Sequence, residues 1–200
     1  MPRSGRIVIP NVAHHVTHKG INGKNIFLHD SDREIYLDIL RERCEIYGLS
    51  ILGYCLMTNH VHFVCVPDYA FSLMKVIGGS HRQYARLFNL KYGRKSSLWQ
   101  DRFFSCALGE GHFLQALIYV DHNPVRAGIV SCPEDYRWSS AASHIGRKDA
   151  AGLLDLVKWE KIAESCGWEE LIGIAQPLAI LEEIRRHTKA GKPLGLGKDL

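Results

Sequence analysis

The 200-residue sequence has no hydrophobic run long enough to cross a membrane. A membrane-spanning helix needs about 20 consecutive apolar residues, and polar residues interrupt every apolar stretch here well before that length. The first ten residues, MPRSGRIVIP, include basic residues but no apolar run of signal-peptide length. We therefore expect no membrane partner and a protein that remains in the cytoplasm, with enough chain for one compact domain with its own core.

The sequence also lacks paired cysteine motifs, although it has six cysteines. None of them stands in a C-x-x-C pair, the spacing that zinc ribbons and thiol redox sites use. Most lie within apolar patterns, where a reduced cysteine behaves as a small hydrophobic side chain. The sequence thus predicts neither a zinc ribbon nor a disulfide framework.

Acidic residues are missing from two long segments and scarce in a third. Residues 1–29 have no Asp or Glu, and neither does the segment 185–198, which has five Lys and Arg residues. Residues 80–105 have six basic residues against a single acid, Asp101. The net charge of the whole chain is only +4, so its basic residues are concentrated in blocks. Such blocks are typical of proteins that bind a polyanion, although many solvated surfaces have a similar composition.

The hydrophobic periodicity predicts a strand, a helix, a hairpin, a helix, a strand and a helix, which cover residues 11–20, 31–49, 50–67, 70–90, 97–108 and 111–122. Ser31 and Glu34 have the spacing of a capping box at the start of the first helix. Gly78 and Gly79 predict a disturbance inside the second helix. Because strands outnumber parallel crossovers in this order, we expect an α+β fold with a mainly antiparallel sheet, followed by helical segments after residue 131.

Two histidines, His60 and His62, interrupt an otherwise apolar strand in the stretch MTNHVHFVCVP. Residues i and i+2 of a strand point to the same face, about 6.6 Å apart along it. Two imidazoles in this position can converge on one metal ion, and they can equally line a polar cleft or the exposed face of a one-sided sheet.

A second pair of polar residues lies in LIYVDHNPVRAG, where Tyr119 and Asn123 are four positions apart. This spacing places both side chains on one face of a helix, so a helix packed on the histidine face would bring a phenol and an amide oxygen to the same site. Other interpretations stay open. Tyr119 fits a half-buried core position, and Asn123 fits a helix N-cap with Pro124 at the first helical position.

Five stretches of the chain form an ordered set that is specific together, although none is specific alone. The main ones are GYCLMTNHVHFVCVP (53–67), GRKSSLWQDRFFS (93–105) and YVDHNPVRAG (119–128). Weaker ones are MPRSGRIVIPNVAHHVTHKG (1–20) and RRHTKAGKPLG (185–195). With this set the sequence resembles the HUH single-strand DNA transposases, and most closely their branch of REP-associated tyrosine transposases.

The resemblance implies a fold and an activity. The fold is a ferredoxin-like α+β domain, with an antiparallel sheet and helices on one face, at residues 1–130. Residues 131–200 would then form a helical C-terminal extension with a basic tail. The activity is metal-dependent cleavage and rejoining of single-stranded or hairpin DNA at REP-like palindromes, through a 5′-phosphotyrosine intermediate.

By the same resemblance, Tyr119 is the expected nucleophile, and His60, His62 and Asn123 are the expected ligands of Mg²⁺ or Mn²⁺. Two points qualify this ligand set. His122, beside Asn123, is a competing ligand or an acid–base group. Because Mg²⁺ prefers oxygen ligands, a site with two histidines favours Mn²⁺ or Zn²⁺ in vitro.

Basic and aromatic residues outside this site are expected to bind the DNA strand. Aromatic rings stack on unpaired bases, and arginines hold the phosphates between them. The expected DNA-binding residues are Arg82, Arg86, Arg94, Lys95, Trp99, Arg102 and Arg126. Each also has an ordinary structural interpretation: Trp99 as a core residue, Arg102 in a salt bridge, Arg126 as a brace at the helix end, and the others as solvated charges.

Two other functions compete with strand transfer. One is a protein that binds hairpin DNA without cutting it, and the other is an unrelated metallohydrolase that uses the two histidines. The joint presence of Tyr119, both histidines and Asn123 argues against the first, and the lack of an H-E-x-x-H or carboxylate-rich motif argues against the second. We expect a monomer, with a dimer as the alternative.

Overall fold

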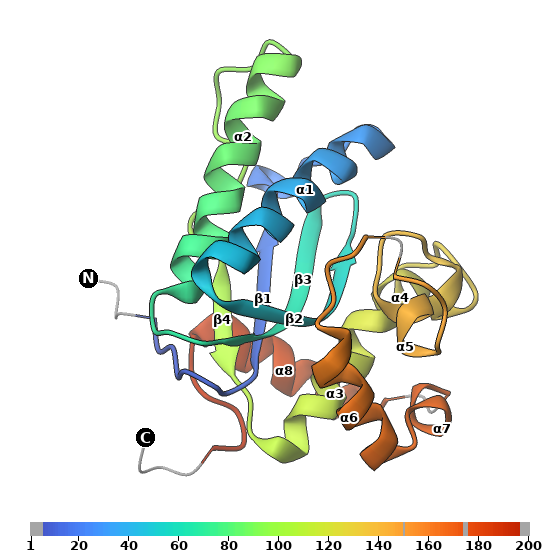
Figure 1. The fold of residues 1–200 in the computed structure, drawn as a ribbon. Helices are drawn as coiled ribbons and strands as arrows, with labels where there is room; N and C mark the ends of the chain where they lie inside the picture. Colours follow the sequence, from blue (N-terminus) through green and yellow to red (C-terminus); the bar gives the residue numbers. More distant parts are fainter. Residues whose placement is uncertain (1–5, 150, 174–175, 197–200) are drawn as a thin grey trace.

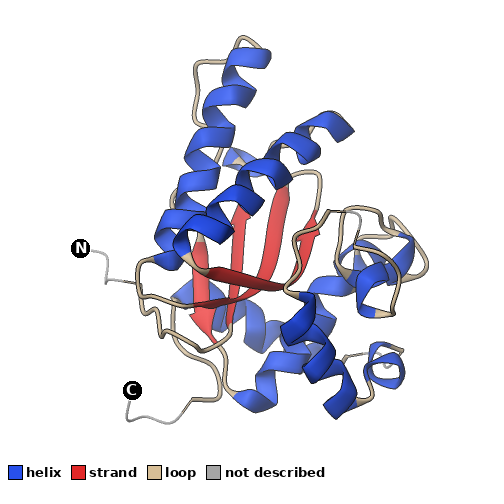
Figure 2. Ribbon diagram, viewed as in Figure 1, coloured by secondary structure: helices blue, strands red, loops and turns tan. Residues whose placement is uncertain are grey.

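A four-stranded antiparallel sheet forms the centre of the computed structural model, which describes residues 6–149, 151–173 and 176–196. Its strands are β1 (His14–Lys19), β2 (Leu49–Leu56), β3 (His60–Pro67) and β4 (Phe104–Ala107). They lie in the order β2-β3-β1-β4, so β1 pairs with β3 on one side and β4 on the other. Figure 2 shows this sheet between layers of helices, and the predicted α+β fold with an antiparallel sheet is confirmed.

The helices of residues 1–130 are α1 (Asp30–Tyr47), α2 (Gly79–Lys91), α3 (Glu110–Asp121) and α4 (Asn123–Arg126). Further along the chain are α5 (Ala141–His144), α6 (Leu156–Cys166), α7 (Trp168–Ile172) and α8 (Leu178–Ala190). The segment after residue 131 is therefore helical as predicted. The last residue of its basic tail, Lys198, lies outside the described residues. Among the described residues, none of the helices combines the length and the hydropathy that crossing a membrane requires.

The helices cover both faces of the sheet (Figure 1). Consecutive residues of β3 point to opposite faces. Phe63 contacts the ring of Tyr36 from α1, whereas His62 contacts the ring of Tyr119 from α3. The sequence predicted helices on one face of the sheet only. In the structure α1 and α2 cover one face, and α3 and α8 cover the other.

The two glycines that predicted a disturbance lie where the helical geometry changes. A π-helical turn, Met74–Gly78, precedes α2, and α2 begins at Gly79. The guanidinium of Arg43 on α1 occupies the space beside Gly79, so a side chain there would require the flexible end of Arg43 to move.

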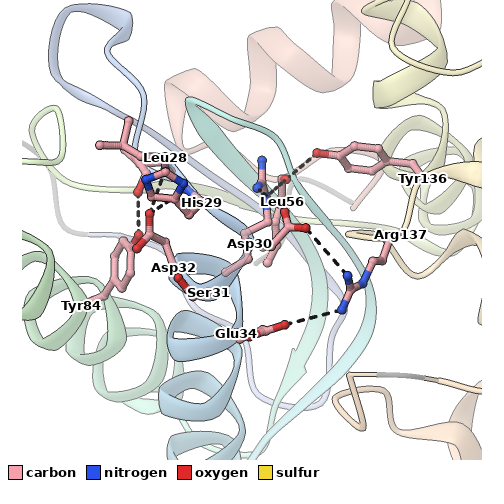
Figure 3. Close-up of polar contacts among 12 residues, drawn as sticks. Leu28, His29, Asp30, Ser31, Asp32, Glu34, Leu56, Tyr84, Tyr136 and Arg137 are labelled. Carbon is pink, nitrogen blue, oxygen red and sulfur yellow. Dashed lines mark hydrogen bonds and ion pairs between the residues drawn. The ribbon is translucent and has the colours of Figure 1, made fainter.

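The start of α1 differs from the prediction, because the helix begins at Asp30 and Ser31 lies inside it. The carboxylate of Asp32 accepts hydrogen bonds from the backbone nitrogens of Leu28 and His29, at 2.9 and 3.0 Å. It also accepts from Lys91 Nζ at 2.7 Å, which ties the start of α1 to the end of α2. Glu34, predicted as the capping partner, instead pairs with Arg137 at 3.5 Å (Figure 3).

A buried ion pair fixes the C-terminal end of α3. His144 Nδ1 lies 2.6 Å from a carboxylate oxygen of Asp121, and both side chains are fully buried. The other oxygen of Asp121 accepts from Ser140 Oγ at 2.9 Å, and His144 Nε2 donates to the carbonyl oxygen of Leu52 in β2 at 2.7 Å. Because both ring nitrogens face acceptors, this histidine is satisfied as an imidazolium. The pair thus holds α3, α5 and β2 together.

We predict that Asp32→Asn lowers the free energy of unfolding by about 2 kcal/mol at pH 7, because the carboxylate accepts charge-assisted hydrogen bonds. Burial by itself raises the pKa of Asp32. Hydrogen bonds from Lys91 and from backbone N–H groups lower the pKa by more than burial raises it, so it falls below its usual value of 3.8. A depressed carboxyl pKa contributes stability at neutral pH that is lost as the pH falls through it.

Urea unfolding at pH 7 and at pH 3 measures this effect. The difference between the wild type and Asp32→Asn shrinks at pH 3, because the carboxyl of the unfolded chain takes up a proton below its usual pKa and the contribution of the lowered native pKa is then partly lost. Asp38→Asn is the matched control on the same helix, because the Asp38 side chain is exposed and forms a surface pair with Arg41. An equal loss in both variants would contradict the role assigned to Asp32.

We also predict that Asp121→Ala costs about 3 kcal/mol of stability, because it leaves His144 Nδ1 and Ser140 Oγ buried without the carboxylate that they contact. Guanidinium unfolding measures the loss, and Asp135→Ala, at an exposed position, serves as the control. A loss below about 1 kcal/mol for Asp121→Ala would show that the pair does not hold the three elements together.

Candidate functional site

The face of the sheet that α3 and α8 cover brings together three histidines and one tyrosine. The ring centroids of His60 and His62 are 5.0 Å apart, and those of His62 and Tyr119 are 5.5 Å apart. His15, on β1, stacks on His62 at 5.3 Å and also contacts Tyr119 at 5.5 Å. The structure therefore places the predicted nucleophile beside both predicted histidine ligands within one chain.

A cavity of about 470 Å³ opens at this cluster. Its lining comes from β1, from β3 and the turn before it, from β4, and from the two helices that cover this face. The lining residues are Thr17, His18, Lys19, Asn59, His60, Phe104, Tyr119 and Arg185. Basic side chains thus border the space in front of the phenol, where they would attract an anionic group.

A chain of hydrogen bonds sets the orientation of His62. His62 Nδ1 lies 3.0 Å from His15 Nε2, and His15 Nδ1 lies 2.7 Å from Thr188 Oγ1 on α8. If His62 donates from Nδ1, His15 accepts at Nε2 and donates from Nδ1 to Thr188. This consistent arrangement leaves the lone pair of His62 on Nε2, the atom that a metal ion would use.

A separate hydrogen bond determines which ring nitrogen of His60 has the lone pair. Its Nδ1 lies 2.6 Å from the side-chain oxygen of Asn59, so Nδ1 donates and Nε2 has the lone pair. Burial lowers the pKa of His60 to about 4 and the pKa of His62 well below 6.5. Both imidazoles are consequently neutral near pH 7, which is the form that binds metals.

The phenol of Tyr119 is held by basic residues and is only 3% exposed. Arg185 Nε donates to its hydroxyl at 3.2 Å, and the guanidinium of Arg126 lies over its ring at 4.3 Å. The side chain of Leu117 on α3 packs against β2 at Gly53, which has no side chain. A Cβ atom at Gly53 would lie 2.7 Å from Leu117 Cδ2, so a larger residue would disturb the packing of the tyrosine helix on the sheet.

Asn123, the third predicted ligand, begins α4 and is 8% exposed. Its Nδ2 donates to the carbonyl oxygens of Tyr119 at 3.1 Å and Val120 at 3.3 Å, so it closes the end of α3. His122 is the N-cap of α4, and its Nε2 donates to the carbonyl oxygen of Ile172 at 2.7 Å. The two bonds from Nδ2 occupy the amide nitrogen of Asn123, and metal binding by its amide oxygen stays a prediction.

Two nitrogen atoms of this site are suited to bind one divalent metal ion. In the described part of the chain, no three His, Cys, Asp or Glu side chains come together as a metal site. His15 cannot add a third nitrogen, because both of its ring nitrogens are engaged. The fit therefore rests on Nε2 of His60 and His62, and further ligands would have to be oxygen atoms from Asn123, water or a phosphate.

The predicted DNA-binding residues fall into four groups. Arg82, Arg86 and Arg102 are exposed and line a cavity separate from the tyrosine site. Trp99 is only 7% exposed, and its Nε1 donates to the carbonyl oxygen of His81 at 3.0 Å, so it is packed as a core residue. Arg126 braces the end of α3 by donating to the carbonyl oxygen of Tyr119.

The remaining pair, Arg94 and Lys95, lies after the end of α2. Arg94 stands 5.5 Å from the ring of Phe88, and Lys95 is exposed. Neither residue lines the tyrosine cavity, so contact with DNA stays a prediction for both.

Sequence analysis did not predict three residues of this site: His15, Thr188 and Arg185. His15 had a detectable signal, because it alternates with Thr17 on β1 and so faces the same side as His60 and His62 once β1 pairs with β3. Thr188 and Arg185 belong to α8, and nothing in the local pattern indicates that this helix returns to the sheet.

The sequence profile of a protein family described as "Transposase IS200 like" matches residues 10–123. The matched segment is more than half of the chain and includes His60, His62, Tyr119 and Asn123. No curated protein sequence matches the chain.

Among solved structures, the chain is similar to a REP-associated tyrosine transposase bound to a REP hairpin, with a TM-score of 0.60. The two sequences are 18% identical, over 78% of this chain and 90% of that one, so the likeness concerns the fold. A protein of Deinococcus radiodurans R1 with a provisional assignment as a transposase is 20% identical over 60% of this chain and 97% of that one. Its TM-score of 0.42 is too low to support an inference about this chain. On the evidence of the family profile and its site residues, the chain belongs to the IS200-like transposase family.

Proposed function

We propose that this transposase cuts and rejoins single-stranded or hairpin DNA through a covalent bond to Tyr119. The observation that supports the proposal is the placement of the phenol 5.5 Å, centroid to centroid, from His62, whose Nε2 is free for a metal ion. Tyr119, His60 and the basic side chains of Lys19 and Arg185 line one cavity, and His62 lies against the phenol ring behind it, which are the groups that phosphoryl transfer requires.

The proposed reaction begins when the Tyr119 oxygen attacks a phosphorus atom of the DNA backbone. A P–O bond to tyrosine forms, the bond to the 3′ oxygen breaks, and a strand with a 3′-hydroxyl leaves. The phosphodiester energy is kept in the 5′-phosphotyrosine, so the hydroxyl of another strand can reverse the step and rejoin the DNA. The phenolic proton has to leave before or during attack, because a free tyrosine has a pKa of about 10.

Residues of this chain assist each part of that step. His60 and His62 would hold Mg²⁺ or Mn²⁺, which when bound supplies positive charge that polarises the phosphate. The guanidinium of Arg185, 3.2 Å from the phenol oxygen, stabilises negative charge that develops there. Lys19, at the rim of the same cavity, attracts the phosphate backbone.

Hairpin DNA is the proposed partner, because the similar solved transposase binds a REP hairpin. We also propose that one chain suffices for the reaction. The tyrosine and both histidines come from a single chain and already contact one another, so no residue from a second copy is needed to complete the cluster.

We predict that Tyr119→Phe abolishes a covalent protein–DNA adduct, a fall of at least about a thousandfold, because it removes the attacking oxygen. The assay uses labelled hairpin oligonucleotides with randomised single-stranded flanks, incubated with Mn²⁺ and separated on a denaturing gel. Tyr69→Phe is the matched control, since Tyr69 is exposed and does not line the tyrosine cavity, and it keeps the wild-type adduct.

The same assay separates the competing functions. Hairpin binding by the wild type with no adduct under any metal would identify a binding protein that does not cut. Cleavage that survives Tyr119→Phe would identify a metallohydrolase that uses the histidines. Either result contradicts the proposed reaction.

We predict that His60→Ala raises the Mn²⁺ concentration for half-maximal adduct formation at least about tenfold, because it removes one of two nitrogen ligands. His29→Ala is the control, since His29 is exposed at the start of α1. Mn²⁺ binding is also measured without DNA, by isothermal titration calorimetry. Equal Mn²⁺ requirements in both variants would show that His60 is not a metal ligand.

A further inference from the structure

A second cavity, of about 380 Å³, lies between α2 and residues 97–103, apart from the tyrosine site. Its volume is within the range of small-molecule sites, roughly 300–1,000 Å³. Four arginines line it: Arg6, Arg82, Arg86 and Arg102. Its lining also includes the aromatic rings of Trp99 and Phe103 and the small side chain of Ala85. The combination of planar rings with guanidinium groups is the one that binds an unpaired nucleotide.

The charge of this cavity favours an anion. Within the part of the chain that the structure describes, Arg82, Arg86 and Arg102 form no ion pair with Asp or Glu. Arg6 and Arg102 both line the cavity, and burial, together with the nearby charge of Arg102, lowers the pKa of Arg6 to about 10. Asp101 is the one acidic residue of the lining, so positive charge is in excess.

The aromatic wall of the cavity is rigid. Trp99 stacks on His18 at 4.7 Å and on His81 at 4.1 Å. His81 is fixed in turn, because its Nε2 lies 2.9 Å from the hydroxyl of Tyr36, and its Nδ1 lies 2.8 Å from His18. A wall that is already ordered loses little entropy when a base packs against it.

The guanidinium of Arg6 provides a second planar surface. It lies over the ring of Phe103 at 3.6 Å and donates to the carbonyl oxygen of the same residue at 2.8 Å. A guanidinium stacked on an aromatic ring is planar and weakly hydrated, so its free side can receive a base. Arg82 and Arg86, which are exposed, remain available for the flanking phosphates.

The second cavity adjoins the tyrosine site, with which it shares one lining residue. His18 lines both of them. A third cavity of about 270 Å³ shares Phe104 with the tyrosine site, and it shares Arg6, Arg102 and Phe103 with the second cavity. The three cavities therefore form a path from Tyr119 around the β4 edge of the sheet to α2.

We propose that this path holds the single strand that is cut at Tyr119, and that the cavity beneath Arg82 and Arg86 receives one of its unpaired bases. The inference rests on the proposed function for the identity of the strand. It goes further in assigning a base-binding site on the opposite face of the sheet from the phenol, with Trp99 as part of its fixed wall rather than as an exposed stacking platform.

Ala85→Phe tests the proposal, because it fills the cavity from α2 without removing charge. Leu90→Phe is the matched control, since Leu90 is exposed on the same helix and does not line the cavity. Binding of a fluorescein-labelled, random-sequence 12-nucleotide single strand is measured by anisotropy. Ala85→Phe weakens binding about fivefold or more, the effect of losing one stacked base, and Leu90→Phe binds like the wild type.

A second pair of variants keeps the test valid if Ala85→Phe does not fold. The double variant Arg82→Ala/Arg86→Ala changes only exposed side chains, and Lys24→Ala/Lys161→Ala removes two exposed charges elsewhere. The first double variant weakens binding more than the second. Equal losses in the two double variants, or equal binding by Ala85→Phe and Leu90→Phe, would overturn the proposed site.

Photocrosslinking locates the bound base directly. The same strand, with iodouracil in place of thymine, is irradiated with the wild-type protein, and the crosslinked peptides are mapped by mass spectrometry. Crosslinks to the segment 97–103 support the site, and crosslinks found only elsewhere overturn it. Because binding and crosslinking need no cleavage, this result is independent of whether Tyr119 forms an adduct.

Discussion

The alternation of side chains along β1 and β3 is the constraint on which both faces of this protein depend. Each of these two strands has a neighbouring strand on both sides, and helices cover both faces of the sheet. The side chain of every residue in them therefore points toward one layer of helices or the other. His15 and His62 point to the face that α3 and α8 cover, whereas His18 and Phe63 point toward α1 and α2. A shift of one residue in the pairing would exchange the two sets and destroy the histidine cluster.

The position of the tyrosine depends on a second constraint, the attachment of α3 to the sheet. Gly53 lets Leu117 approach β2, and the buried pair of Asp121 and His144 holds the end of the helix two residues beyond the tyrosine. Trp159 stacks on His144 at 3.9 Å and shields the pair from water. The helix that presents the phenol is therefore held at its end by ionic contacts and along its length by close packing, so the phenol has little freedom to move relative to the histidines.

The sequence predicted those strands and helices whose side-chain spacing is visible over a few neighbouring residues. The alternation around His60 and His62 indicated a strand, and the spacing of Tyr119 and Asn123 indicated one face of a helix. The resemblance then joined the two, and the ring contacts of Tyr119 with His62 confirm that the two elements meet. The capping box was placed two residues too late, because Asp32 has stronger partners than Glu34 through its contacts with α2, and sequence spacing alone does not reveal those contacts.

Contacts between distant segments were the part that the sequence could not predict. The aromatic and basic stretch around Trp99 suggested an exposed ring for stacking, but His18 and His81 enclose that ring after folding. The partners of the site histidines were equally hidden. Thr188 and His15 are 173 positions apart, and no period in the chain relates them. Tertiary packing decided these cases, because the same residues are compatible with either environment until the fold is known.

The hydrogen bond between His15 and Thr188 has a consequence for the order in which the protein matures. A ribosome makes β1 before α8, and 173 positions separate His15 from Thr188, so the support for His62 is absent until α8 has been synthesised. Contacts over such a separation also form late in folding, because the intervening chain must first be ordered. A nascent or truncated chain would already have Tyr119, but it would lack Arg185 against the phenol and Thr188 beneath the histidines. The arrangement thus delays a complete cluster until α8 has been made and has packed on the sheet.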